Sequence, residues 1–412
     1  MLIGVALLPY LLANLGVGRL GVLTLVWAFI GYFSIFDFGL GRALTYTVSS
    51  LKVQGQMDRA VGSIKAGMLL LVLIGCLGAT AISAVVVTFG IGWLNVNPKI
   101  DEETYRSILI ASAAIPLTTI TSGLKGALEG FERFKAANIL RTTLGISNFA
   151  IPAVTVAIYG PDLTLIVLGL LLARLAVMLM HFAVLERILR PLRSGHVFSR
   201  KESRDLAKFG AWMSVSNVLS PLMVVSDRFV ISHFVGGSSV AYYSVPLDCL
   251  FRLLIIPGAL TATLFPAFAQ RLISPESGRI ELQRLYGRAL RVIAMLMLPV
   301  TLGIAVLSHA GLNLWLGKAF ADNAYVVVII IAFGIFFNGM AQVPHTMIQA
   351  SGDVKKTSLV HVGEIVVYMP AMVYLVINFG IVGAALAWQL RVMADFFVLH
   401  ALATRKLRHA VI

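Results

Sequence analysis

The chain has few charged residues for its length. Asp, Glu, Lys and Arg make up 13% of its 412 residues, about half the share that is usual in soluble globular domains. Hydrophobic residues make up 58%, which suits a protein whose surroundings are lipid. This balance argues against a water-soluble enzyme and predicts an all-helical, polytopic membrane protein.

Cysteine is almost absent. Cys76 and Cys249 lie within apolar stretches and form no spaced pair, so neither a disulfide framework nor a cysteine-based metal site is indicated. Histidines also show no metal-ligand spacing with an acid, and packing is favoured over a proton relay for each of them. We therefore expect no cofactor and no metal. The histidines in or beside apolar stretches are at positions 181, 233, 345, 361 and 400.

Nucleotide-binding motifs are missing as well. No GxxxxGK[ST] motif occurs, so the chain has no Walker-type ATPase site of its own. Gly16, Gly18 and Gly21 spell GxGxxG, but no strand precedes them, and this context argues against a dinucleotide site. No loop gathers converging catalytic groups, so the sequence does not predict an enzyme.

Twelve apolar stretches run through the chain. A helix needs about 20 apolar residues to cross a membrane. The first stretch is short for this and lacks the basic start of a signal peptide, so we interpret it as a transmembrane helix without its beginning. The stretches are residues 1–16, 20–49, 64–94, 107–128, 138–160, 163–185, 209–236, 239–268, 288–310, 324–350, 358–379 and 381–402.

Lys and Arg are concentrated in every second loop. One set of loops and span ends holds 23 of the 33 basic residues, whereas the opposite set holds only Arg19, Lys99, Arg106 and Lys318. Because cytoplasmic loops carry the excess of basic residues, both termini are predicted to be cytoplasmic. The net charge of +14 is spread over short loops that would meet anionic headgroups, so it does not indicate nucleic-acid binding.

The chain repeats itself weakly at an offset of about 220 residues, which is typical of transporters with two parallel halves. Gly16 matches Gly236, and the turn at Gly160 matches the turn at Gly380. The expected organisation is an amino-terminal lobe of six helices at 1–185, a basic cytoplasmic linker at 186–208 and a carboxy-terminal lobe of six helices at 209–412.

Several charged residues lie within the predicted spans. Each costs about 2.5–3.5 kcal/mol there on insertion scales, so each needs a partner or water. Asp248 with Arg252, and Arg391 with Asp395, are spaced i, i+4, where each pair can neutralise itself on one helix face. Arg174, the counterpart of Arg391 once three residues are gapped, has no local acid.

Two interpretations of these charges remain open. In one, arginines line a shared water-filled cavity and hold an anionic phosphate by charge-assisted hydrogen bonds. In the other, they only form ion pairs between helices. Ten of the 14 prolines lie within spans, and bent helices around a hydrated cavity would explain part of them. The predicted cavity cations are Arg42, Arg174, Arg252 and Arg391, and the candidate ion carriers are Asp37, Asp227 and Glu364.

Three segments carry a resemblance to a known family. LPYLLANLGVGRLGVLTLVWAFIGYFSIFDFGLGRAL at 8–44 resembles the amino-terminal signature of Wzx-type bacterial polysaccharide flippases, in the multidrug/oligosaccharidyl-lipid/polysaccharide superfamily. GALEGFERFKAAN at 126–138 and DRFVISHFVG at 227–236 resemble later signatures of that family. Similarity of architecture covers the whole chain.

The resemblance implies a V-shaped pair of six-helix lobes in the cytoplasmic (inner) membrane that alternates between inward-open and outward-open forms. The implied substrate is an undecaprenyl-diphosphate-linked oligosaccharide, such as an O-antigen unit of lipopolysaccharide, and an ion gradient is the implied energy source. The implied partners are membrane lipids and the polysaccharide polymerase machinery. Arg252, ahead of Pro257, is similar in placement to a diphosphate-binding arginine of the lipid II flippases.

Two other functions remain as alternatives. A cation-coupled multidrug exporter of the same superfamily would favour an acidic, aromatic pocket, and the arginines within these spans outweigh that expectation. A membrane-embedded glycan polymerase or ligase usually has a large outer loop, whereas the outer loops near 95–106 and 311–323 are short. The sequence therefore favours a flippase.

Overall fold

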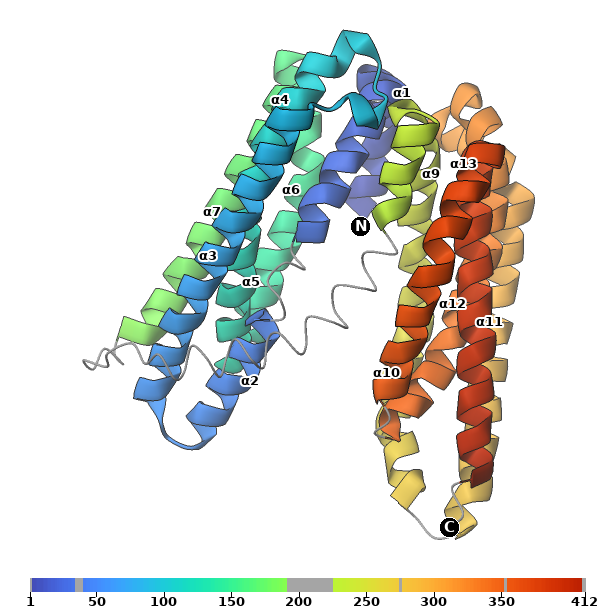
Figure 1. Cartoon of the computed structure of the whole chain (residues 1–412). Helices are drawn as coiled ribbons and strands as arrows, with labels where there is room; N and C mark the ends of the chain where they lie inside the picture. Colours follow the sequence, from blue (N-terminus) through green and yellow to red (C-terminus); the bar gives the residue numbers. More distant parts are fainter. Residues whose placement is uncertain (1, 34–39, 191–224, 274–275, 352–353, 410–412) are drawn as a thin grey trace. The chain divides into compact units, whose positions relative to one another are not determined.

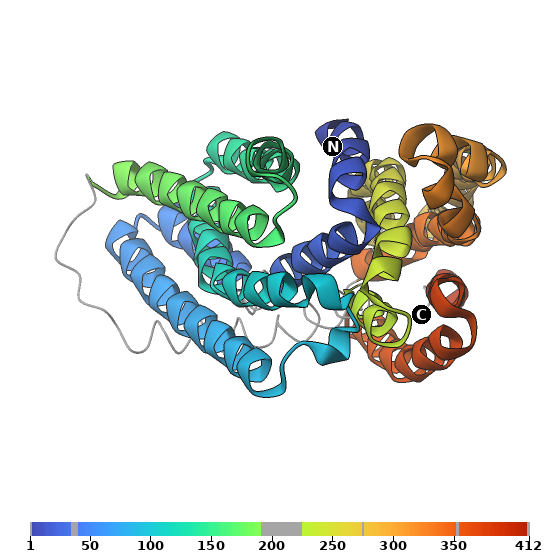
Figure 2. The same ribbon diagram turned by 90° about the horizontal axis from the view of Figure 1, so that it is seen from above.

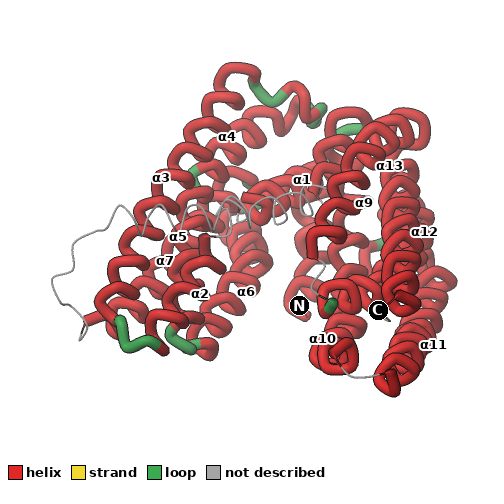
Figure 3. Tube along the Cα trace, turned by 60° about the horizontal axis from the view of Figure 1, so that its bottom comes forward, coloured by secondary structure: helices red, strands yellow, loops and turns green. Residues whose placement is uncertain are grey.

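A computed structural model describes residues 2–33, 40–190, 225–273, 276–351 and 354–409 of the chain (Figure 1). These residues are almost entirely helical, with short turns and no strand among them (Figure 3). Nine stretches of this described part are long and apolar enough to cross a membrane. The predicted all-helical membrane fold is therefore confirmed.

The helices form two compact units. One comprises Met1–Phe229 with Gly236–Ser238, and the other comprises Val230–Val235 with Ser239–Ile412. Most of the linker expected at 186–208 lies outside the described residues. Each unit has its own buried core, as expected for a chain built from two halves.

The amino-terminal unit is built around α5, which packs against α2 and lies between α3 and α7 (Figure 2). Leu44, Leu71, Leu124 and Leu185 of these four helices meet in one buried cluster. The helices of this unit are α1 (Leu2–Phe33), α2 (Leu40–Val53), α3 (Met57–Phe89), α4 (Asp101–Ser112), α5 (Ala114–Gly130), α6 (Phe134–Tyr159) and α7 (Leu163–Leu189), with the short 3-10 helices η2 (Gly92–Leu94) and η3 (Pro98–Ile100).

In the carboxy-terminal unit, α12 packs along both α11 and α13 (Figure 1). Trp388 of α13 is fully buried and lies against Gly334 of α12, where a larger residue would collide with the indole ring. The helices of this unit are α9 (Gly237–Leu250), η5 (Phe251–Leu254), α10 (Ile255–Ile273), α11 (Glu276–Leu316), α12 (Lys318–Ala350) and α13 (Val354–His409).

The glycines that the sequence repeat matched all have positive φ angles. Gly16 and Gly236 have φ angles of 70° and 117°, and Gly160 and Gly380 have φ angles of 83° and 58°. This left-handed region strains residues that carry a Cβ. Gly160 follows α6, and Gly380 divides α13 into two arms that run side by side (Figure 1). The backbone therefore supports the predicted repeat.

Candidate functional site

A polar hollow lies on α2 in the amino-terminal unit. The buried face of this helix carries Leu40, Ala43, Leu44, Val48 and Leu51. The hollow has a volume of about 600 Å³, and its lining residues are Thr45, Tyr46, Ser49, Ser50, Val53 and Gln54 of α2 with Glu129 of α5. The apolar and polar side chains of α2 follow each other with helical period and lie on opposite faces of the helix. A count of apolar residues along the sequence therefore misses the polar face.

Arg42 belongs to α2, but its side chain lies outside the described residues, as does the whole of Asp37. Position 42 precedes Thr45 and Tyr46 by three and four residues. Residues at this spacing share one face of a helix. The register of α2 therefore places position 42 in line with the residues that line the hollow.

Arg174 lies in the contact between α6 and α7. Its side chain is buried, with 6% of the residue exposed. One terminal nitrogen of the guanidinium donates to Oδ1 of Asn148 at 3.1 Å, and the other donates to the carbonyl of Leu170 at 3.2 Å. Both partners belong to the same two helices, which is the geometry of a helix–helix contact.

Asp227 is also buried in the amino-terminal unit. Its Oδ1 accepts a hydrogen bond from the backbone N–H of Arg228 at 2.8 Å, and the guanidinium of Arg228 reaches the carbonyl of Thr24 on α1 at 3.4 Å. The arginine that follows Asp227 is thus itself a buried charge. This contact joins two of the segments on which the family resemblance rests.

Arg252 has the opposite environment, because it is exposed in the middle of an apolar span. Pro257 has no N–H to donate to the carbonyl four residues earlier, and the turn that precedes it is the 3-10 helix η5. Arg252 lies in this turn. With a rise of about 1.5 Å per residue, the guanidinium is about 20 Å from either end of the span Gly237–Phe265.

A charged cluster joins the two arms of α13. One nitrogen of His361 and one carboxylate oxygen each of Glu364 and Asp395 all lie within 4.8 Å of one another. The Nδ1 of His361 is 3.3 Å from Oε2 of Glu364. The guanidinium carbon of Arg391 lies 5.3 Å from the centre of the Tyr368 ring. Two acids therefore share this region with one guanidinium.

The same region opens into a groove of about 540 Å³ between the arms. Glu364, Tyr368 and Arg391 contribute polar groups to it, and the rest of its lining is apolar. The ring of His345 on α12 lies 6.2 Å from the ring of His361. Two histidines and two acids thus lie close to one another near this groove.

Our sequence interpretation of His361 as a packing residue missed this cluster. The spacing of His361 and Glu364, i and i+3, was visible in the chain and would have suggested a contact on one helix face. Asp395 comes from the other arm, so the turn at Gly380 was needed to bring it there.

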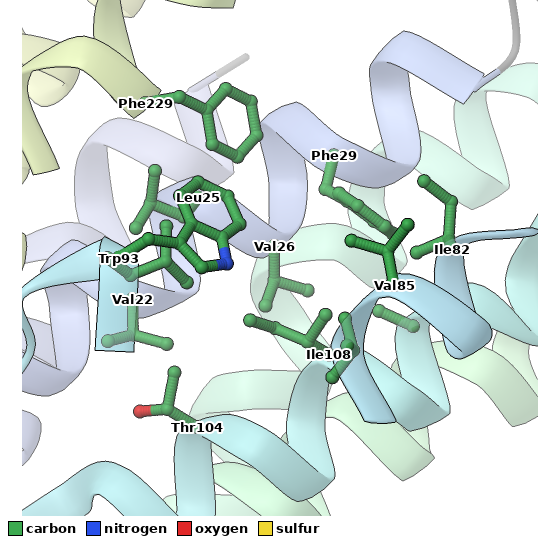
Figure 4. A pocket seen from close by; sticks show the side chains of 13 residues that line it. Val22, Leu25, Val26, Phe29, Ile82, Val85, Trp93, Thr104, Ile108 and Phe229 are labelled. Atoms are coloured by element: carbon green, nitrogen blue, oxygen red, sulfur yellow. The ribbon is translucent and has the colours of Figure 1, made fainter. Parts of the chain in front are cut away.

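An apolar pocket of about 400 Å³ lies at the other end of the amino-terminal unit, near the turn after α3 (Figure 4). Val26, Val85 and Ile108 point into it from α1, α3 and α4, and Trp93 and Phe229 close one side. Thr104 is the polar exception, and its hydroxyl donates to the carbonyl of Ile100 at 2.7 Å. The pocket thus offers a hydrocarbon surface.

Comparison with known sequences identifies the family. The family described as "Polysaccharide biosynthesis protein" matches residues 1–272. A Shigella flexneri protein assigned as an O-antigen transporter is 31% identical over 405 residues, which covers 98% of this chain and 94% of that protein. A Haloferax volcanii protein assigned as a low-salt glycan biosynthesis flippase is 25% identical over 49% of this chain and 42% of its own length.

Solved structures share the fold at low sequence identity. An inward-facing multidrug resistance MATE family transporter of the MOP superfamily superposes with a TM-score of 0.79 at 12% identity and covers 99% of this chain and 94% of its own. The lipid II flippase MurJ, in an inward closed conformation, gives a TM-score of 0.72 at 16% identity, with 99% and 89% covered. With this fold and the sequence match over 1–272, the chain belongs to the polysaccharide biosynthesis protein family.

Proposed function

We propose that this chain is a flippase that carries lipid-linked oligosaccharides from the cytoplasmic to the outer leaflet for polysaccharide synthesis. The family and the names of the relatives support a transporter of this kind. The structural observation that carries the proposal is the exposed Arg252 in the middle of a membrane span. A charge there costs about 2.5–3.5 kcal/mol in lipid, so we infer that the guanidinium faces water.

The substrate explains why a transporter would keep such a group. Each sugar hydroxyl that leaves water without a new partner costs roughly 2–7 kcal/mol, so a glycan crosses only along a hydrated, hydrogen-bonding path. Arg252 would hold the diphosphate by charge-assisted hydrogen bonds, and Arg42 is a second candidate phosphate ligand, in the amino-terminal unit. The lipid tail would stay in the bilayer while the headgroup moves.

For Arg174 and Arg391, the observed contacts favour the second interpretation of the intramembrane charges. Arg174 donates to groups of its own helix pair, and Arg391 lies over the Tyr368 ring with Asp395 four residues further along the helix. Their roles would be to hold helices together and to balance acids. The proposed phosphate-binding arginines that remain are therefore Arg252 in the carboxy-terminal unit and Arg42 in the amino-terminal unit.

We assign ion coupling to Glu364, with His361 and Asp395 as its partners. The carboxylates of Glu364 and Asp395 repel each other when both are ionised, so a proton or a small cation beside them stabilises the cluster. Asp227 and Asp37 remain the other candidate carriers. Independently, a membrane potential that is negative inside favours outward movement of an anion by roughly 2.3 kcal/mol per charge per 100 mV.

The proposed location is the cytoplasmic (inner) membrane, with both termini in the cytoplasm. The bias of basic residues toward alternate loops supports this orientation. A polysaccharide polymerase that consumes the delivered units is the proposed partner, since the product of a flippase is the substrate of the next step on the outer surface.

The test uses the purified full chain in liposomes with a labelled undecaprenyl-diphosphate oligosaccharide. The wild-type chain should invert the lipid, and Arg252→Ala should reduce inversion to the background rate without reducing the amount of folded protein. Arg291→Ala removes an exposed arginine of the same unit and should have no effect. Efflux of a cationic drug, or formation of new glycosidic bonds in place of inversion, would contradict the proposal.

A further inference from the structure

The hollow on α2 has a chemistry that none of the charged residues above provides. Every lining residue except Val53 carries a hydrogen-bonding group: three hydroxyl side chains of Ser or Thr, one phenol, one amide and one carboxylate. Among the described residues that line it, none is Lys or Arg. Hydroxyl, phenol and amide groups make up most of this described lining, so it suits a hydroxyl-rich ligand that both donates and accepts hydrogen bonds.

The hydrogen-bonding groups of the hollow offer both donors and acceptors. Thr45 already donates to the carbonyl of Gly126 at 3.1 Å, which leaves its oxygen as an acceptor. Ser50 accepts a hydrogen bond from Nε2 of Gln54 at 3.0 Å and keeps its own proton to donate. The hydroxyl of Ser49 takes part in none of the hydrogen bonds found in the described chain. A polyol needs such a mixed set, because each of its hydroxyls both donates and accepts.

Tyr46 gives the hollow an aromatic wall. It is 66% exposed although its neighbours Leu44 and Val48 are completely buried. A tyrosine ring supplies a flat apolar face with a polar rim, which matches a sugar ring, whose C–H groups form an apolar face and whose hydroxyls form the edge. The volume of about 600 Å³ equals that of about twenty liquid waters and exceeds that of one sugar ring.

The helix that carries this surface is held firmly. Gly41 of α2 and Gly126 of α5 are in backbone contact, since a Cβ on Gly126 would collide with the carbonyl of Gly41. Gly130 of α5 lies against the side chain of Val48, which a Cβ at position 130 would also meet. The charge of Glu129 is partly balanced by Lys125, whose Nζ lies 3.5 Å from it. A rigid backbone keeps the lining groups in place before a ligand arrives, which reduces the entropy lost on binding.

From these observations we infer that the α2 hollow binds sugar rings of the transported glycan, with Tyr46 stacking on a ring and Ser49, Ser50 and Gln54 exchanging hydrogen bonds with its hydroxyls. The inference rests on the proposed flippase function and adds a headgroup site to it. Lys52 and Arg59 follow the hollow and belong to the cytoplasmic set of charges. The site would therefore act at the loading side of the membrane.

The test measures affinity for two lipids that differ only in the headgroup region. Undecaprenyl diphosphate bearing one N-acetylglucosamine and undecaprenyl diphosphate without sugar are titrated onto the detergent-solubilised full chain by microscale thermophoresis. Tyr46→Ala should raise the Kd for the sugar-bearing lipid roughly three- to tenfold, and Tyr46→Ala with Ser49→Ala should raise it about tenfold or more. The Kd for the lipid without sugar should not change.

Matched variants separate recognition from folding. Tyr159 is 69% exposed in the same unit and does not line the hollow, so Tyr159→Ala should bind both lipids normally. Tyr46→Phe keeps the ring and should keep most of the affinity, whereas Thr47→Ala on the same helix should have no effect.

Three outcomes would overturn the sugar site. These are an unchanged Kd in the double variant, an equal loss for both lipids, and an equal loss in Tyr159→Ala. The flippase proposal would survive each of them if wild-type liposomes still invert the lipid. Conversely, sugar-dependent binding without inversion would refute the transport proposal and leave the binding site standing.

Discussion

The α6–α7 hairpin and the α13 hairpin are counterparts in the sequence repeat, yet they hold their arginines differently. In both, an arginine of the second arm meets a residue that lies 12 positions before the glycine of the turn: Asn148 before Gly160, and Tyr368 before Gly380. Arg174 is buried and donates to the Asn148 amide oxygen, whereas Arg391 lies over the Tyr368 ring.

The difference between the hairpins lies in what surrounds each arginine. The α13 hairpin brings Glu364 and Asp395 together and opens into a groove of about 540 Å³. Asn148 is a neutral partner, so Arg174 stays in a closed contact. The same hairpin backbone can therefore form a structural helix–helix contact in one half and a candidate ion site in the other. A few side chains decide whether the contact is neutral or acidic.

The largest expected effect tests whether the α13 hairpin, unlike the α6–α7 hairpin, is an ion site. Glu364→Gln should abolish the part of transport that depends on an ion gradient, because the amide cannot take up a proton or balance a cation. Transport by the liposome assay with and without an imposed proton gradient measures this. Asp322 is the matched control, since it also pairs with a histidine, His309, at 2.9 Å but is about half exposed; Asp322→Asn should retain gradient dependence. A gradient response in Glu364→Gln would remove Glu364 from the coupling site.

The next effect tests the α6–α7 hairpin. Arg174→Ala should destabilise the protein by about 2–4 kcal/mol, because it leaves a cavity and an unpaired Asn148 amide in a buried contact. Thermal unfolding in detergent measures the loss. Inversion per folded molecule should stay within about twofold of wild type. Loss of inversion at an unchanged unfolding temperature would instead assign Arg174 to the substrate cavity.

A smaller effect concerns the contact between Arg391 and Tyr368. Tyr368→Leu should cost about 0.5–1 kcal/mol of cation–π energy, and Arg391→Ala should cost little more, because Arg391 is only half-buried. A double-mutant cycle of these changes, read by thermal unfolding, isolates the pair. A coupling energy near zero would mean that the ring only fills space.

The smallest expected effect on stability comes from an exposed ion pair outside the spans. The contacts of the two hairpins should each contribute more. The Nζ of Lys52 is 2.9 Å from Oε2 of Glu132, and the hydrogen bond and charge of Lys52 lower the pKa of Glu132 below its usual 4.5. The pair therefore stabilises the fold above the unfolded pKa, and this contribution disappears as the pH falls through the folded pKa. In Glu132→Gln, and likewise in Lys52→Gln, the free energy of unfolding should fall slightly less as the pH is lowered into the acid range. A steeper fall in either variant would contradict the pairing.

Much of the candidate site was visible in the chain before folding. Arg252 ahead of Pro257 marked a bent span, and the structure places that arginine exposed in a 3-10 turn. The hydroxyl row of α2 was hidden, because residues 20–49 read as one apolar stretch and its polar side chains lie between apolar ones. Helical period separates the two sets only once the start of the helix, at Leu40, is known.

The sequence by itself determined that the protein is embedded in a membrane, that its basic loops alternate and that its two halves repeat. These follow from composition and local backbone demands, since lipid requires apolar helices and a left-handed turn requires glycine. Only the tertiary structure decided which charges meet. Asp395 lies beside Glu364 from 31 residues away, and Asn148 contacts Arg174 from 26 residues away. Closing each hairpin brings these residues together, and the spacing of neighbouring residues in the sequence does not indicate which ones will meet.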